Sequence, residues 1–268
     1  MRSEAWQGDF KIGLVLAGIV VSMVLVSLFY TPYDYNEMDP RVRFIPPGLR
    51  HPMGTDNFGR DVFSRIMIGG RYTLLVSLVT VLGSVVIGAS LGLVTGYLGG
   101  ICNELVMRLM DAISSFPGIL LALVMVALMK NGLFTLIIAL LILFIPSYVR
   151  IMRSGMLQYK TRDFVKIAEI MGASHFRIIF VHLLPNIASS LLSATVLGLS
   201  NAILAEATMS YLGLGIQPPV PSWGRMLSES QSFLFNAPWC ALMPGIMIMV
   251  TVIAFHYIGE GIRKRSEA

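Results

Sequence analysis

The chain has 268 residues, of which 55% are hydrophobic and 13% are charged, and its mean hydropathy is +0.74. Soluble domains usually carry about 25% charged residues, so this composition excludes an ordinary soluble domain and indicates an integral membrane protein. The net charge of +5 does not indicate nucleic-acid binding, because the Lys and Arg residues lie between apolar runs and form no patch interleaved with aromatic residues. We interpret this charge as orienting the chain in a bilayer.

The first apolar run, Ile12–Tyr30, is close to the roughly 20 residues needed to cross a bilayer. Its length and its Tyr-, Pro- and Asp-rich exit, without a small-residue cleavage site, predict a retained span rather than a removed signal peptide. A polar connector, Thr31–Arg71, follows. Within it, four apolar residues are spaced to line one face of a helix on the membrane surface: Val62, Phe63, Ile66 and Met67.

The second predicted span, Leu74–Leu98, carries a stripe of small residues that continues past its end. They recur every four residues: Ser84, Gly88, Gly92, Gly96 and Gly100. Small residues on one face let another helix approach closely. The sequence therefore predicts a helix-packing seam, more readily against a span of the same chain than against another chain.

A connector with three charged residues, Gly99–Ser115, is expected next. Arg108 and Asp111 stand three residues apart, so an ion pair between them is the simpler interpretation. A charge carried into a membrane segment can also mark a transport pathway, so Asp111 is kept as a pathway candidate.

Four further spans complete a predicted set of six, with Lys130-Asn131-Gly132 as a tight turn between the first two of them. They are Phe116–Met129, Leu133–Val149, Ile187–Ala205 and Cys240–Ile258. Glu206 is expected at the outer end of the fifth span, and Pro146 is expected to loosen the fourth near its end.

Between the fourth and fifth spans lies a polar, basic island, Tyr148–Asn186. Its spacing predicts a short amphipathic helix, with Thr161 or Asp163 as the N-terminal cap and Gly172 at its end. The apolar stripe of this helix consists of Phe164, Ile167, Ala168 and Met171. Such a helix must be covered by its own bundle, by lipid headgroups or by a groove in a partner protein.

The spacing of Ala168, Gly172 and Leu184-Pro185 resembles the EAA loop of permeases of ATP-binding cassette (ABC) importers. The chain departs from that motif by having Lys166 and Ile167 in place of its Glu and first Ala. The resemblance implies a coupling helix near residues 161–174 that docks into a cleft of an ATPase subunit. The residues assigned to this role are Asp163, Phe164, Ile167, Ala168, Met171 and Gly172.

Two other stretches resemble the peptide and nickel importers of the same class. Gly54–Arg65, GTDNFGRDVFSR, matches the signature G-T-D-x-x-G-R-D-x-x-S-R that follows the first span in one of their two permease subunits. A network of paired charges, such as Asp61 with Arg65, is the alternative interpretation of this stretch. Tyr211–Leu227, YLGLGIQPPVPSWGRML, is similar to their F-L-G-L-G-x-x-P-P-x-P-x-W-G segment. Its Gly- and Pro-rich backbone is irregular and needs protein or water as hydrogen-bond partners. We therefore expect this segment at a protein-lined mouth and not in lipid.

The chain is thus identified as a C-type permease subunit of the dipeptide, oligopeptide and nickel family. This implies an all-α integral membrane protein with six transmembrane helices and a cytoplasmic EAA-type coupling helix, the type I ABC importer permease fold. We divide it into residues 1–71, the first span and connector, and residues 72–268, the five-span core. Candidate pathway or gate residues are Arg60, Asp61, Asp111, Glu206 and Trp223.

The resemblance also implies the partners: a second related permease, two ATPase subunits that carry ATP and Mg, an extracytoplasmic substrate-binding protein, and the lipid of the cell membrane. With the coupling helix in the cytoplasm, six spans place both termini there as well. The Arg-rich first connector runs against the positive-inside rule in this orientation. Short peptides are the expected substrate, and nickel or a metal chelate stays an alternative.

No catalytic motif occurs in the sequence: there is no phosphate-binding G-x-x-x-x-G-K-[ST], no H-E-x-x-H, no paired-Cys motif and no His cluster. We therefore expect no catalytic residue, no metal site and no cofactor bound by this chain. Cys102 and Cys240 are expected to be inert. A stand-alone, gradient-driven secondary transporter is the alternative of another class, against which stands the lack of an evident inverted repeat.

Overall fold

The computed structural model describes residues 2–267, in which all regular structure is helical apart from one β-bridge between Thr55 and Asp61. The long helices are α1 (Arg2–Ser27), α2 (Val62–Leu98), α5 (Leu133–Lys160), α8 (Leu184–Tyr211) and α10 (Trp239–Glu267). The shorter ones are α3 (Gly100–Ser114), α4 (Gly118–Met129), α6 (Asp163–Ile170), α7 (His175–Arg177), α9 (Trp223–Ser230), the π-helical η2 (Ile178–Leu183), and the 3₁₀ turns η1 (Pro40–Val42) and η3 (Gln231–Phe233).

Five helical stretches in the described residues are long and apolar enough to cross a membrane, and a sixth crossing exists only if α3 and α4 together form one span. The expected connector Gly99–Ser115 is helix α3, and the expected third span is reduced to the 12 residues of α4. A helix of that length measures about 18 Å, well short of the hydrocarbon core. Pro117 interrupts the pair, because a proline disfavours helical backbone in the residue before it, and the two helices meet at 90°.

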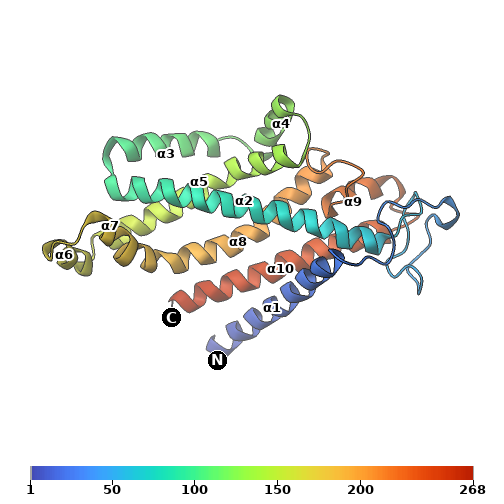
Figure 1. The fold of residues 1–268 in the computed structure, drawn as a ribbon, viewed down its shortest axis with the longest axis horizontal. Coiled ribbons are helices and arrows are strands. Elements are labelled where there is room, and N and C mark those ends of the chain that lie inside the picture. The colour runs from blue at the N-terminus through green and yellow to red at the C-terminus, as the bar shows by residue number, and fades with distance from the viewer. Residues whose placement is uncertain (1, 268) are drawn as a thin grey trace.

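The long helices run roughly alongside one another, with different parts of the chain at the two ends of the bundle (Figure 1). The N and C ends lie at the end that carries α6, whereas α9 and the loop between α1 and α2 lie at the opposite end. We call these the α6 end and the outer end. Helix α3 runs back beside α2, so α3 and α4 together lead the chain from the α6 end to the outer end.

The small residues of α2 pack directly on α5, which confirms the interpretation of the stripe as an intramolecular seam. A Cβ atom on Gly92 would stand 2.8 Å from Met152 Cβ, and one on Gly96 would stand 2.6 Å from Met156 Cβ. The Ser84 hydroxyl donates to the Leu141 carbonyl oxygen at 3.1 Å. Gly100 is outside the seam, since it begins α3 with open space around it.

Helix α2 begins at Val62, twelve residues before the predicted start, so the predicted surface helix is the first part of α2. Val62 and Ile66 are buried against the α9–α10 region. The expected boundary between residues 71 and 72 falls within this helix. The early start has a local cause: the Asp61 carboxylate accepts a hydrogen bond from the Ser64 backbone N–H at 2.8 Å and caps the helix.

Candidate functional site at the two ends of the bundle

Helix α6 turns one narrow face toward its own chain and leaves a larger apolar face uncovered. Val165 is buried and Ala168 packs beside it, against residues of α5 and α8. Ile167, Ile170 and Met171 are exposed, the last two at 84% and 81%. The predicted stripe is therefore corrected at two positions: Ala168 belongs to the inner face, and Ile170 belongs to the outer one.

The outer face of α6 also includes Phe164, which is partly exposed, and Asp163 in the first turn. Neither predicted cap forms: the N-cap residue is Arg162, whose side chain makes no capping hydrogen bond. The Asp163 carboxylate instead lies 3.4 Å from Lys166 Nζ on the solvent side. Ile167, Ile170 and Met171 thus stand largely uncovered at the tip of the α6 end, with the partly exposed Phe164 beside them.

Gly172 ends α6 as predicted. Its φ is +78°, a left-handed conformation that costs a residue with a Cβ about 1–2 kcal/mol. The Gly172 N–H donates to the Glu169 carbonyl at 3.0 Å, and the Ala173 N–H donates to the Ala168 carbonyl at 3.0 Å. This pair of bonds is a Schellman motif, which closes the helix and reverses the chain toward α7.

The chain returns to the membrane through α7 and η2, which lead without a break into α8. Pro185 explains the π-helical stretch, because it has no N–H to donate to the carbonyl four residues earlier. The Asn186 side-chain amide satisfies a nearby carbonyl, that of His182, at 2.6 Å. Phe176 and Phe180, one turn apart, extend the exposed apolar surface, with ring centroids at 4.3 Å.

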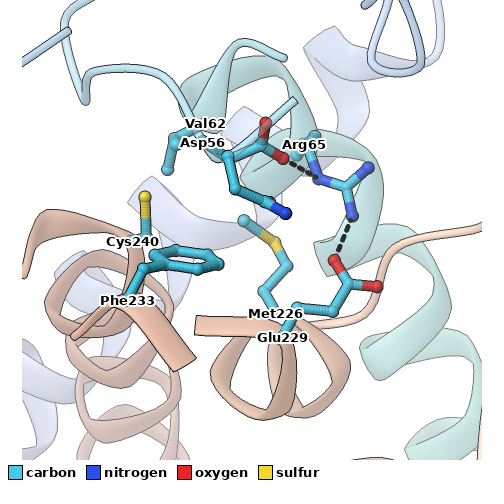
Figure 2. A pocket seen from close by; sticks show the side chains of 8 residues that line it. Asp56, Val62, Arg65, Met226, Glu229, Phe233 and Cys240 are labelled. Carbon is cyan, nitrogen blue, oxygen red and sulfur yellow. Dashed lines mark hydrogen bonds and ion pairs between the residues drawn. The ribbon is translucent and has the colours of Figure 1, made fainter. Parts of the chain in front are cut away.

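The outer end holds a cluster of buried charges built from the Gly54–Arg65 stretch and α9 (Figure 2). Arg65 Nη2 lies 3.0 Å from Glu229 Oε2, and its Nε lies 3.9 Å from Asp56 Oδ2. Arg60 reaches the same two carboxylates, at 2.6 Å to Asp56 and 3.3 Å to Glu229. Arg65 is only 2% exposed. Buried charges of this kind are tolerated only when paired, so the cluster fixes the loop onto α9.

Asp61 does not pair with Arg65 as the alternative interpretation suggested. One carboxylate oxygen caps α2, and the other lies 2.8 Å from His51 Nδ1. His51 thus makes a local hydrogen bond within this loop. The two arginines of the motif pair instead with Asp56 inside the motif and with Glu229 far along the chain. Two of the arginines of the first connector are therefore engaged in ion pairs within the chain.

Trp223 and Glu206 are packed inside the outer end rather than exposed at it. Trp223 is fully buried at the start of α9, and its Nε1–H donates to the Ile66 carbonyl at 3.0 Å. Glu206 was expected at the outer end of a span, but α8 continues to Tyr211 and buries it completely. The Ser210 hydroxyl donates to Glu206 Oε1 at 2.7 Å.

Asp111 pairs with a different residue from the one predicted. Its carboxylate lies 2.8 Å from Arg150 on α5, whereas Arg108 pairs with Glu104 on α3. Arg150 also donates to the Ser114 hydroxyl, at 3.1 Å. These contacts tie α3 to α5 near the α6 end, on a partly exposed face. The described residues contain no cluster of three or more His, Cys, Asp or Glu side chains placed to hold a metal ion.

An open groove of about 580 Å³ adjoins the charge cluster at the outer end. Its charged lining residues are Arg60, Arg225 and Glu229. Sequence reasoning missed the last two. The spacing of Arg225 and Glu229 at i, i+4 on α9 was visible, and their ion pair measures 3.3 Å. Nothing in the sequence connects Glu229 with Arg65, which lies 164 residues away.

The family model and the curated relatives agree on the family of this chain. The family model "Binding-protein-dependent transport system inner membrane component" matches residues 84–267. The dipeptide transport system permease protein DppC of Alkalihalophilus pseudofirmus is 39% identical over 97% of this chain and 87% of its own length. The glutathione transport system permease protein GsiD of Pectobacterium atrosepticum is 36% identical over 93% of this chain and 84% of its own.

Among solved structures, a chain of the MetNI methionine ABC transporter in an inward-facing conformation superposes with a TM-score of 0.63. It is 20% identical, and the match covers 74% of this chain and 94% of that one. At this identity the similarity shows the fold, which is that of an ABC importer permease. The predicted fold class is confirmed, and the chain belongs to the family of binding-protein-dependent transport system inner membrane components.

Proposed function

We propose that this chain is the second, C-type transmembrane permease subunit of an ATP-driven importer of short peptides, and that it forms half of the translocation path. The substrate class rests on the relatives, which are permeases for dipeptides and for glutathione. The chain itself binds no cofactor in this proposal, and ATP and Mg belong to two partner ATPase subunits. A second related permease and an extracytoplasmic binding protein complete the assembly.

The observation that carries the proposal is the uncovered apolar face of α6. Ile167, Ile170 and Met171 project from the tip of the α6 end, on a helix whose other face is fixed to its own chain. Large apolar side chains at an aqueous surface favour a protein groove, and an amphipathic helix in a groove is a common recognition mode. We assign this face, together with Asp163 and Phe164, to the ATPase contact.

The inner face of α6 provides the route by which ATPase motion would reach the spans. Val165 is packed in one cluster with Met152 and Met156 of α5 and with Ile187 of α8. Because such a core is close-packed, a displacement of α6 moves the ends of both helices with it. The geometry supports rigid-body alternating access, in which closure of the ATPase dimer switches the spans between inward and outward openings.

The orientation follows from the same proposal. With α6 in the cytoplasm, both termini are cytoplasmic, since they lie at the same end of the bundle, and the outer end faces the extracytoplasmic space (Figure 1). Arg60 and Asp61 then stand near the extracytoplasmic mouth, while Asp111 stands on the cytoplasmic half. Gly172 positions the chain reversal beside the ATPase contact.

The test is purification of the tagged chain from native membranes, with identification of the co-purifying proteins and an assay of their ATP hydrolysis. We expect a second permease and ATPase subunits, and stimulation by di- to pentapeptides together with a binding protein. Stimulation of ATP hydrolysis by nickel chelates instead of peptides would show that the substrate is a metal chelate and not a short peptide. A chain that purifies alone and takes up substrate in vesicles by an ion gradient would overturn the proposal in favour of a secondary transporter.

A further inference from the structure

We infer that the groove at the outer end is a transit subsite that binds the carboxyl terminus of the incoming peptide. We call it the outer groove, and it is formed by the loop before α2, the Pro218-Pro219 segment and α9. The inference rests on the proposed function and adds a ligand-binding site to it. The volume of about 580 Å³ lies within the roughly 300–1,000 Å³ typical of small-molecule sites.

The charge balance of the cluster favours an anion. Three guanidinium groups, those of Arg60, Arg65 and Arg225, face two carboxylates, those of Asp56 and Glu229, so the cluster carries one surplus positive charge. Arg65 is enclosed, and the surplus reaches the outer groove through Arg60 and Arg225, which line it. A carboxylate bound there would complete the charge pairing.

Arg225 is the guanidinium best placed to receive that carboxylate. Its side chain is 24% exposed, and within the described residues only its Nε is engaged, by Glu229 Oε1 at 3.3 Å. Its two terminal nitrogens stay available for a bidentate contact, which is the geometry in which arginine recognises a carboxylate. Glu229 holds the side chain in place for this contact.

A second feature of the outer groove points to a ligand independently of charge. The side-chain oxygen of Asn36, another lining residue, is buried and has no hydrogen-bond partner among the described residues. A buried acceptor without a partner costs about 1–3 kcal/mol, so such an atom calls for a partner such as a bound water or a ligand. A turn of the Asn36 side chain toward the outer groove would let a peptide N–H satisfy this oxygen while the peptide carboxylate pairs with Arg225.

The remaining lining suits peptide side chains of varied type. Phe58, held beneath the Arg60 guanidinium at 4.7 Å, and the rings of Pro218 and Pro219 supply apolar walls without a shaped pocket. The polar contacts therefore recognise only two groups that every short peptide has, the terminal carboxylate and the backbone N–H. The partial exposure of Arg225 keeps the contact weak, which suits a site from which the substrate must move on.

The test uses the complex purified from native membranes and placed in lipid nanodiscs without the binding protein. The probe is a radiolabelled photoreactive dipeptide, alanyl-benzoylphenylalanine, and its crosslinks are mapped by mass spectrometry. We expect crosslinks within residues 36–60 and 216–229. Unlabelled dialanine should displace the probe at a concentration about tenfold lower than its C-terminal amide, the factor for loss of one charged hydrogen-bonded contact.

Three variants sharpen the result, each checked for assembly with its partners. Arg225→Gln should abolish the preference for the free acid over the amide. Asn36→Ala should weaken the displacement of the probe by the free acid and by the amide equally. It removes the acceptor for a peptide N–H and leaves the carboxylate site intact. Arg43→Gln, a matched change at an exposed arginine of the same loop outside the groove, should leave both competition curves unchanged.

Equal displacement by acid and amide in the unmodified complex, or crosslinks confined to other residues, would overturn the subsite. So would the absence of crosslinks combined with a loss of binding-protein-stimulated ATP hydrolysis in Arg225→Gln, because the carboxylate would then come from the binding protein. In each of these cases an assembled, ATP-hydrolysing complex shows that the proposed function stands. Failure of the unmodified chain to assemble with ATPase subunits removes the proposed function and this inference together.

Discussion

The two ends of the bundle differ in how their charged side chains and their helix faces are engaged. At the α6 end, Ile167, Ile170 and Met171 are exposed on one helix face, whereas at the outer end the charged side chains of Arg60 and Arg65 are buried. Burial of charge requires partners within the chain, and the outer end supplies them. Exposure of large apolar groups requires partners outside it. The difference indicates that the buried charges of the outer end are paired mostly within this chain, and it supports the proposed ATPase contact at the apolar face of α6.

The largest expected effect on stability is therefore at the outer end. Replacing Arg65 by Ala leaves the buried Asp56 and the partly buried Glu229 with one fewer cation, and loss of one partner of a buried charge cluster typically costs about 3–5 kcal/mol. The measurement is the unfolding free energy of the purified chain in mixed micelles, from an SDS titration followed by tryptophan fluorescence.

The matched control for this change is Arg108→Ala, which removes an arginine from an exposed i, i+4 pair with Glu104. Exposed pairs contribute about 0–1 kcal/mol, so this variant should unfold nearly like the unmodified chain. Equal losses in the two variants would contradict the distinction between a buried and a solvated charge cluster.

An intermediate effect is expected at Gly172. Replacing it by Val places a β-branched residue at φ +78°, which should destabilise the end of α6 by about 1–2 kcal/mol or more. The unfolding free energy should fall less than for Arg65→Ala, while recovery of ATPase subunits in pull-downs should drop. Gly48→Val, at a loop glycine whose φ is not positive, is the control. Full ATPase recovery with Gly172→Val would show that the chain reversal is dispensable for docking.

A still smaller effect on stability, with a large effect on assembly, is expected at Ile167. Because this side chain is exposed, Ile167→Glu should change the unfolding free energy by no more than about 0.5 kcal/mol. The same change should reduce capture of the ATPase subunits by at least about tenfold, since it places a charge in an apolar contact.

Substitutions at the two residues before Ile167 test the other faces of α6. Lys166→Glu makes a larger charge change on the polar side and should leave capture nearly intact, whereas Val165→Glu buries a charge and should unfold the local structure. Capture that is lost equally in Ile167→Glu and Lys166→Glu would indicate a general electrostatic effect instead of a specific face.

The smallest effect is expected at an exposed ion pair of the outer loop. The Arg41 guanidinium, hydrogen-bonded to Asp39 at 2.9 Å, holds the pKa of that carboxyl below its ordinary value of 3.8. A carboxyl whose pKa is lowered on folding stabilises the folded state above its unfolded pKa and loses that contribution as the pH falls through the folded pKa. Arg41→Ala should thus differ slightly from the unmodified chain at pH 7, and the difference should shrink as the pH falls below 3.8 and vanish below the lowered pKa of Asp39. A difference that grows on acidification would contradict this sign.

The sequence by itself determined the features that depend on neighbouring residues. Apolar runs located the long helices, because a bilayer requires about 20 such residues in succession. The four-residue spacing of Gly88, Gly92 and Gly96 predicted a packing face, since these residues share one side of a helix. Gly172 marked the end of α6, because a left-handed residue there favours glycine. Boundaries were less accurate: α2 and α5 extend past their predicted limits, since polar helix ends outside the bilayer carry no hydropathy signal.

Only the tertiary structure decided which residues meet. Glu229 joins Arg65 across 164 residues of chain, and Asp111 joins Arg150 instead of Arg108, because helix packing sets these distances. The spacing of apolar residues in α6 could not predict which face is buried, since residues on the exposed face and on the inner face are both apolar. The outer groove is likewise a product of packing, for it brings together loops that have no local pattern in common. Periodicity is fixed within one helix, whereas a site made of several helices exists only once the bundle has formed.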